Sequence, residues 1–139
     1  MSDYRQTKST SRKIAMVNNA HFLKNMRNNE EEKIQAALVQ HLQLRGAKDM
    51  LFLHPANGGK RNVVEAVKFK RLGVLPGASD LLFWRDGQSY ALELKAKGNR
   101  PTDLQDDFME RFKEAGGYAF WVDGLDEALA VLNSWGLIR

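Results

Sequence analysis

The stretch that decides the fold is residues 79–95, which read SDLLFWRDGQSYALELK. Two runs of strand-forming residues, 79–85 and 88–95, flank the pair Asp86-Gly87. An Asp-Gly pair between two such runs is a strong signal for a tight antiparallel hairpin. We therefore predict two paired strands joined by this turn.

The register of this hairpin brings two carboxylates together. With Asp86 and Gly87 as the loop, Asp80 pairs with Glu93. A symmetric longer loop keeps that pairing, whereas a three-residue loop or a bulge shifts it by one. Directly paired residues point to one face, with Cβ atoms ~5 Å apart. Lys95, two residues after Glu93, projects on the same face.

Like charges placed opposite each other destabilise a hairpin, so folding alone does not call for Asp80 and Glu93. The opposite face is apolar and consists of Leu81, Phe83, Tyr90, Leu92 and Leu94. A divalent cation between the carboxylates would explain their placement, since hard oxygen ligands suit Mg²⁺ or Mn²⁺. The alternative is that Asp80 caps a strand end while Glu93 and Lys95 lie on a solvated face, which explains the pairing less well.

Around the hairpin, the sequence predicts an α/β domain with a mixed sheet. Periodicity and capping signals predict helices over residues 30–44, 62–72, 102–115 and 123–135. Apolar runs predict a short buried strand at 50–54 and another strand at 118–122. In the second helix, we expect Val63, Ala66 and Val67 on the inner side.

Composition indicates one ordinary globular domain with a basic N-terminal arm. The chain has 139 residues and no cysteine, which excludes disulfides and thiolate zinc sites. Residues 1–28 carry a net charge of +5, whereas residues 29–139 carry −1. We expect residues 1–28 to be a flexible arm or a short helix, suited to contacting phosphates or simply solvated, and residues 29–139 to be the functional domain.

The combined motifs resemble a nuclease family. Asp80, followed after twelve residues by Glu93-Leu94-Lys95, is similar to the signature of the PD-(D/E)XK nuclease superfamily. More narrowly, the chain resembles the virus-type replication-repair nuclease domain, VRR-NUC, over about residues 30–135. The corresponding segments are the acidic helix 30–44, the loop HPANGGKR at 54–61, the turn GVLPGASD at 73–80, the Glu-x-Lys at 93–95 and the helical Gln105. Ala56 departs mildly from the family's loop.

This resemblance implies a restriction-endonuclease-like core, a mixed central sheet flanked by helices, and Mg²⁺ or Mn²⁺ as cofactor. Asp80 and Glu93 would ligate the metal together with the backbone carbonyl of Leu94. Lys95 would position or activate the attacking water and stabilise charge on the phosphate.

Two further residues have competing interpretations. The resemblance implies that an acid from the first helix also ligates the metal, and we choose Glu31 because it continues the inward stripe of that helix. Glu32 is the fallback, and Glu30, Glu31 and Glu32 could all simply stabilise the helix dipole. Gln105 either lies near the metal, as the resemblance implies, or closes a capping box with Thr102.

A set of polar and basic residues is expected to contact DNA. In the loop these are His54, Asn57, Lys60 and Arg61. For His54, the alternative is a histidine whose hydrogen bonds are satisfied at the end of a strand. In the second helix they are Lys68, Lys70 and Arg71, for which a solvated helix face is the alternative.

The function that these features predict is a metal-dependent DNA endonuclease, acting on branched, flapped or junction DNA in phage or bacterial replication and repair. The alternatives are a non-catalytic nucleic-acid-binding module and an RNA-directed nuclease. We expect a cytoplasmic protein without a membrane segment, and a homodimer because so small a domain has little surface for a junction.

Overall fold

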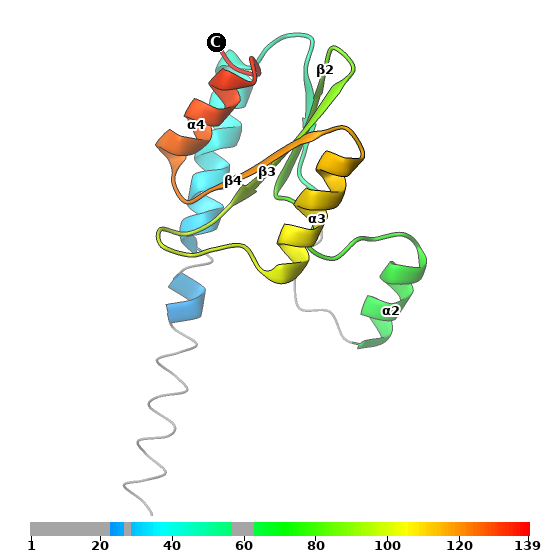
Figure 1. Ribbon diagram of the computed structural model, residues 1–139. Helices are drawn as coiled ribbons and strands as arrows, with labels where there is room; N and C mark the ends of the chain where they lie inside the picture. The colour runs from blue at the N-terminus through cyan, green and yellow to red at the C-terminus, as the bar shows by residue number, and fades with distance from the viewer. Residues whose placement is uncertain (1–22, 27–28, 57–62) are drawn as a thin grey trace, which may run out of the picture.

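The computed structural model describes residues 23–26, 29–56 and 63–139 (Figure 1). Residues 23–26 and 29–45 are helical. The further elements are β1 (Leu51–Leu53), α2 (Val63–Arg71), β2 (Leu81–Arg85), β3 (Gln88–Leu94), α3 (Asp103–Glu114), β4 (Tyr118–Val122) and α4 (Leu125–Ser134). The predicted order of helices and strands is confirmed, and the element ends differ by a few residues.

The four strands form one mixed sheet in the order β1-β2-β3-β4. β1, β2 and β3 are antiparallel neighbours, and β4 runs parallel to β3 after the crossover through α3. Within the hairpin, Leu81 pairs with Leu92 and Arg85 pairs with Gln88. Asp86 and Gly87 both have positive φ, as a two-residue hairpin loop of this twist requires. The predicted register is therefore confirmed.

Helices cover both faces of the sheet. Leu81, Phe83, Leu92 and Leu94 pack on one face against Leu38 and Leu42 of helix 29–45 and against Ala128 and Leu132 of α4. On the other face, Ala91 packs against Phe108 and Met109 of α3. Figure 1 shows this arrangement, with α3 on one side of the strands and α4 with helix 29–45 on the other. β3 is therefore buried on both faces, which forces Glu93 into the interior.

Two expectations about burial are wrong. β1 is an exposed edge strand rather than a buried one, and the side chain of Leu51 is 62% exposed. α2 buries none of its residues, and Val63 and Val67 are 79% and 63% exposed. The physical reason is that α3, α4 and helix 29–45 already cover the sheet, so α2 has no apolar face to pack on and projects from the body (Figure 1).

Part of the predicted molecule lies outside the described residues. This applies to the arm over residues 1–28, apart from the helical residues 23–26, and to Asn57, Lys60 and Arg61. Among the described residues, no helix has the length and apolar character needed to cross a membrane.

Candidate active site

Asp80 immediately precedes β2 and reaches across the hairpin. Its Oδ2 accepts a hydrogen bond of 2.7 Å from the backbone N–H of Leu94. The Nδ1 of His54, just after β1, donates to the backbone carbonyl of Asp80 at 2.5 Å. Asp80 is therefore held from both neighbouring strands at the end of the sheet where β1 and β3 finish.

Glu93 lies next to Asp80, one residue beyond the Leu81–Leu92 pair of the hairpin, and is only 2% exposed. Burial, together with the neighbouring Asp80 carboxylate, raises the pKa of Glu93 to about 9. Burial also raises the pKa of Asp80, although the hydrogen bond from Leu94 opposes this. Two buried carboxylates side by side need a proton or a cation to compensate their charge.

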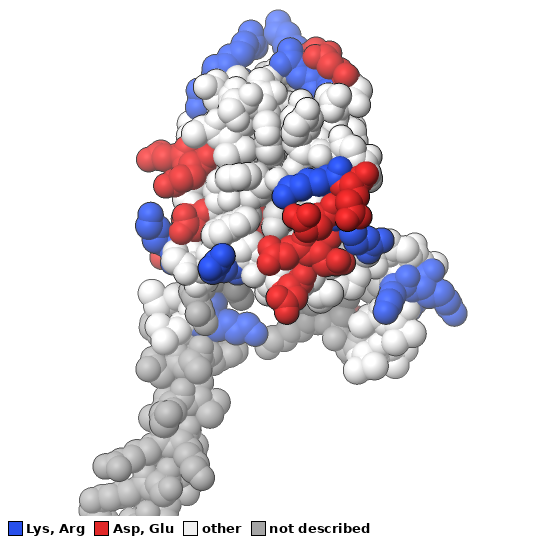
Figure 2. Space-filling model, viewed as in Figure 1, with Lys and Arg blue, Asp and Glu red and all other residues white. Residues whose placement is uncertain are grey.

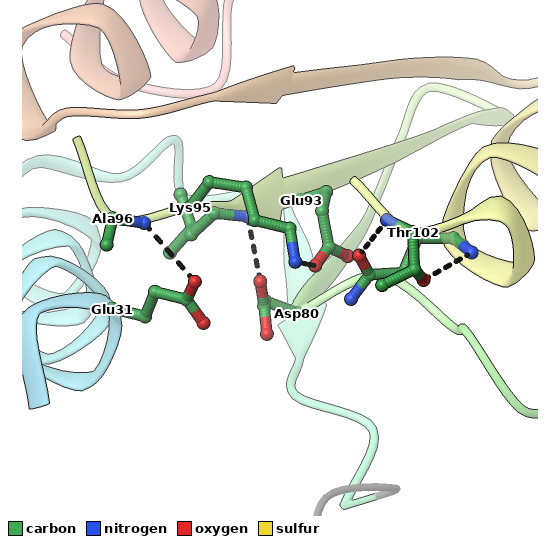
Figure 3. A network of polar contacts seen from close by, with 8 residues as sticks. Glu31, Asp80, Glu93, Lys95, Ala96 and Thr102 are labelled. Atoms are coloured by element: carbon green, nitrogen blue, oxygen red, sulfur yellow. Dashed lines mark hydrogen bonds and ion pairs between the residues drawn. The ribbon is translucent and has the colours of Figure 1, made fainter. Parts of the chain in front are cut away.

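Lys95 directly follows β3 and lies next to the carboxylate of Glu93. Its Nζ lies 3.9 Å from Oε1 of Glu93, and both side chains are buried. The backbone N–H of Lys95 donates to the carbonyl of Val122 in β4, which fixes the direction of the side chain. Figure 3 shows Lys95 above Asp80 with its amine next to Glu93.

Glu31 approaches the same group from helix 29–45. Its Oε1 accepts a hydrogen bond of 3.2 Å from the backbone N–H of Ala96, directly after Lys95. Its charge adds to the effects that raise the pKa of Glu93. Glu30 and Glu32 are exposed, and Glu31 is half-buried. Of the three glutamates, the structure thus brings Glu31 to the carboxylate pair (Figure 3).

Gln105 forms the capping box of α3. The backbone N–H of Thr102 donates to its Oε1 at 2.9 Å, and the backbone N–H of Gln105 donates to Oγ1 of Thr102 at 3.3 Å. Figure 3 shows this capping box at the start of α3. The two interpretations of Gln105 are compatible, because capping uses its oxygen and leaves its amide nitrogen for another partner.

The remaining candidates are spread around this centre. The ring of His54 bonds to the backbone carbonyl of Asp80, and His54 is exposed at the edge of the site. Lys68, Lys70 and Arg71 are exposed on the projecting α2, and the structure places none of them against the carboxylate pair. Figure 2 shows basic side chains on α2 and a group of acidic side chains over α3.

No protein-family model matches the chain, and no curated protein matches it. A solved structure described as a VRR_NUC domain protein superposes with a TM-score of 0.61, over 76% of this chain and 86% of the other. The aligned sequences are 24% identical.

The chain shares its fold with this VRR_NUC domain protein. The expected fold class, an α/β fold with a mixed sheet flanked by helices, is confirmed. The match also agrees with the resemblance drawn from Asp80 and the Glu93-Leu94-Lys95 motif. At this level of identity it establishes the fold, and the chemistry has to be argued from the site.

The VRR_NUC fold here presents a donor set that fits a hard divalent cation. Oε2 of Glu93 is buried and has no hydrogen-bond partner among the described residues. An orphaned carboxylate oxygen next to a second carboxylate suits Mg²⁺ or Mn²⁺, which take oxygen ligands and keep several waters. The described residues contain no group of three or more histidine, cysteine or acidic side chains arranged for a metal. Protein ligation would therefore rest on two carboxylates and backbone oxygen.

Sequence reasoning missed contacts that depend on the VRR_NUC fold as a whole. Gly77, with φ of +83°, lies so close to α3 that a Cβ there would be 2.4 Å from the carbonyl oxygen of Leu104. This approach holds the segment before Asp80 against the start of α3. The positive φ could have been expected from the Pro76-Gly77 turn, but the contact with Leu104 has no local signal.

Proposed function

We propose that this chain is a metal-dependent nuclease that hydrolyses phosphodiester bonds in DNA. The observation that carries the proposal is the buried pair Asp80 and Glu93, in which one oxygen of Glu93 has no partner. Their repulsion destabilises the fold unless a cation or a proton compensates it, so the pair is better explained by function than by folding.

Asp80 and Glu93 would hold Mg²⁺ or Mn²⁺, joined by the backbone carbonyl of Leu94. When bound, the ion supplies Lewis acidity toward the scissile phosphate and lowers the pKa of a bound water. The protein's own contribution is the rigid placement of its ligands. The Leu94 N–H fixes Oδ2 of Asp80 at 2.7 Å, which leaves Oδ1 to face a ligand.

Lys95 would orient the attacking water and stabilise the negative charge that develops on the phosphate. Its burial favours this role, because few waters screen its charge there. Glu31 would hold the chain after Lys95 in place through Ala96 and add negative charge near the metal. The amide nitrogen of Gln105 would donate to the phosphate or to a bound water while its oxygen caps α3.

DNA as the substrate is supported by the VRR_NUC fold and by the basic residues on α2, namely Lys68, Lys70 and Arg71. Such residues bind phosphates without reading sequence. The family resemblance extends the proposal to branched or flapped DNA, for which His54 at the site's edge and the arm over residues 1–28 would add contacts. RNA remains the competing substrate, because the same chemistry acts on any phosphodiester.

The test is a cleavage panel with the full chain and Mg²⁺ or Mn²⁺. Labelled single-stranded, duplex, flap and four-way-junction DNA are compared with RNA hairpins of matched sequence. The proposal expects cleavage of DNA, strongest on a branched form, and none in EDTA. If every substrate stays intact while the protein still binds DNA, the chain is a binding module and the proposal is wrong. Faster cleavage of RNA than of DNA would show that RNA is the substrate instead of DNA.

A further inference from the structure

A hollow adjoins the carboxylate group on the side of helix 29–45. It measures about 300 Å³ and is lined by Glu30, Lys33, Ile34, Lys97 and Asp123. Two of its neighbours belong to the candidate active site: Glu31 lies next to Glu30 on the helix, and Ala96, whose N–H bonds to Glu31, directly precedes Lys97. The hollow therefore adjoins the two chain segments that carry Glu31 and Ala96.

The lining combines three kinds of group. Lys33 and Lys97 are exposed and form no ion pair with the described residues. Ile34 supplies apolar surface, while Glu30 and Asp123 supply acceptors. Asp123 is fixed in place, because its Oδ2 accepts a hydrogen bond of 3.1 Å from the backbone N–H of Gly98.

These groups match the parts of a nucleotide. Lysine ammonium groups bind phosphate, an apolar side chain contacts the flat face of a base, and carboxylates accept hydrogen bonds from the amino or ring N–H groups of a base. Carboxylates can also accept from the amino groups of paired bases, but the ring N–H of thymine or guanine is free only on an unpaired base, because in a duplex it is bonded to the complementary strand. The two carboxylates balance the two lysines, so the hollow as a whole does not attract polyanions indiscriminately.

The opposite side of the site repels a nucleic-acid backbone. The exposed acids of α3 are Asp103, Asp106, Asp107, Glu110 and Glu114. The two basic residues among them, Arg111 and Lys113, form ion pairs with Asp107 and Glu110. Figure 2 shows these acids gathered over α3. A strand leaving the carboxylate group is therefore directed away from α3 and toward Lys33 and Lys97.

We propose that the hollow between helix 29–45 and the turn at residues 97–98 binds one unpaired nucleotide next to the scissile phosphate. The ammonium groups of Lys33 and Lys97 hold its phosphate, and Ile34, Glu30 and Asp123 receive its base. This rests on the proposed nuclease function and deepens it, because the substrate then has an unpaired nucleotide adjoining the cut.

The test uses metal-free full-length protein in EDTA, so that binding is read without cleavage. Amide and methyl NMR spectra are recorded during titration with thymidine monophosphate and, separately, with inorganic phosphate. The nucleotide is expected to shift the signals of the Gly98 amide and the Ile34 methyl groups, and phosphate alone is expected to leave Ile34 unchanged. Lys97→Glu should weaken nucleotide binding by about tenfold, the effect of losing one charge-assisted contact.

Lys48→Glu is the matched control, because Lys48 is an exposed lysine in the turn before β1, at the far end of that strand from His54. It should leave the nucleotide affinity within about twofold of wild type, as expected for a surface change away from the site. With a short single-stranded oligothymidylate, Lys97→Ala should also lower the slope of log affinity against log salt by about 0.7.

The proposal is overturned if Ile34 and Gly98 do not respond, if phosphate alone reproduces the nucleotide's shifts, or if Lys48→Glu weakens binding as much as Lys97→Glu. These results are independent of the nuclease assay. If the protein cuts DNA but does not bind thymidine monophosphate in the hollow, the proposed subsite is wrong and the proposed nuclease function stands. If the protein binds the nucleotide in the hollow but cuts no substrate, the proposed nuclease function is wrong and the proposed subsite stands.

Discussion

Asp80 and Leu94 are joined across the β2–β3 hairpin by a hydrogen bond from the backbone N–H of Leu94 to Oδ2 of Asp80. The bond ties a charged side chain at the start of one strand to the last residue of its neighbour. It fixes one oxygen of the carboxylate that lies next to the buried Glu93. The geometry of the carboxylate pair thus follows from the register of the hairpin.

Two substitutions of Asp80 distinguish the contribution of its hydrogen bond to stability from the contribution of its charge. Asp80→Asn and Asp80→Ala both remove the charge, but only Asn keeps an oxygen that can accept from the Leu94 N–H. We expect Asp80→Asn to be more stable than Asp80→Ala by about 1–3 kcal/mol, the cost of an unsatisfied buried donor. Urea unfolding in EDTA measures the difference, and equal midpoints for the two variants would show that the bond contributes nothing.

The raised pKa of Glu93 predicts how stability depends on pH in the absence of metal. Between its ordinary pKa of 4.5 and about 9, the folded protein binds more protons at Glu93 than the unfolded chain does. The free energy of unfolding therefore falls as pH rises through this window, by at most about 1.4 kcal/mol per pH unit for one proton. The raised pKa of Asp80 acts in the same direction.

Glu93→Gln removes this titration, so its unfolding free energy in EDTA should depend less on pH than that of wild type. Saturating Mg²⁺ should raise the melting temperature of wild type at neutral pH and have little effect on the variant. Glu114→Gln, at an exposed position of α3, is the control and should behave as wild type. Parallel pH profiles for wild type and Glu93→Gln would contradict the assignment of the proton to Glu93.

Lys95 is predicted to act on the reaction rather than on metal binding. Lys95→Ala should lower the cleavage rate by about 10²–10³-fold, the usual effect of removing one group that stabilises developing charge. Its affinity for Mn²⁺, measured by calorimetry, should not fall, because the lysine contributes no ligand. Lys113→Ala on α3 serves as the control for general loss of positive charge. A variant that loses Mn²⁺ binding and activity together would assign Lys95 a structural role.

Gly77 is predicted to be intolerant of a side chain because of its contact with Leu104. Gly73 provides the comparison, since it also has positive φ but open space around its Cβ position. Gly73→Ala should cost about 1–2 kcal/mol from backbone strain alone. Gly77→Ala should cost a further ~1–3 kcal/mol from overpacking. Equal unfolding free energies for the two variants would mean that the segment before Asp80 can move away from Leu104 at no cost in stability.

The hairpin and its carboxylates could be predicted because they depend on local sequence. Asp86-Gly87 sets the loop, the loop sets the register, and the register places Asp80 opposite Glu93. The capping box of Thr102 and Gln105 is equally local, and the structure contains both of its hydrogen bonds.

Burial on α2 could not be predicted, because it depends on which sheet faces the other helices leave open. Val63 and Val67 have the spacing of an inward stripe, but the sheet they would need is already covered. The contact from Glu31 to Ala96 joins residues 65 positions apart, so only the packing of helix 29–45 on the sheet selects Glu31 over its neighbours. The hollow around Lys33 and Lys97 also arises from that packing.

The most direct test of the central claim compares wild type with Asp80→Asn on a labelled flap DNA in Mg²⁺. Loss of a metal ligand removes several kcal/mol of charge stabilisation, so the variant should cut at least about 10³-fold more slowly. It should still bind the DNA and unfold cooperatively. Cleavage by Asp80→Asn at the wild-type rate, or by wild type in EDTA, would contradict the claim that Asp80 and Glu93 form a metal-dependent nuclease site.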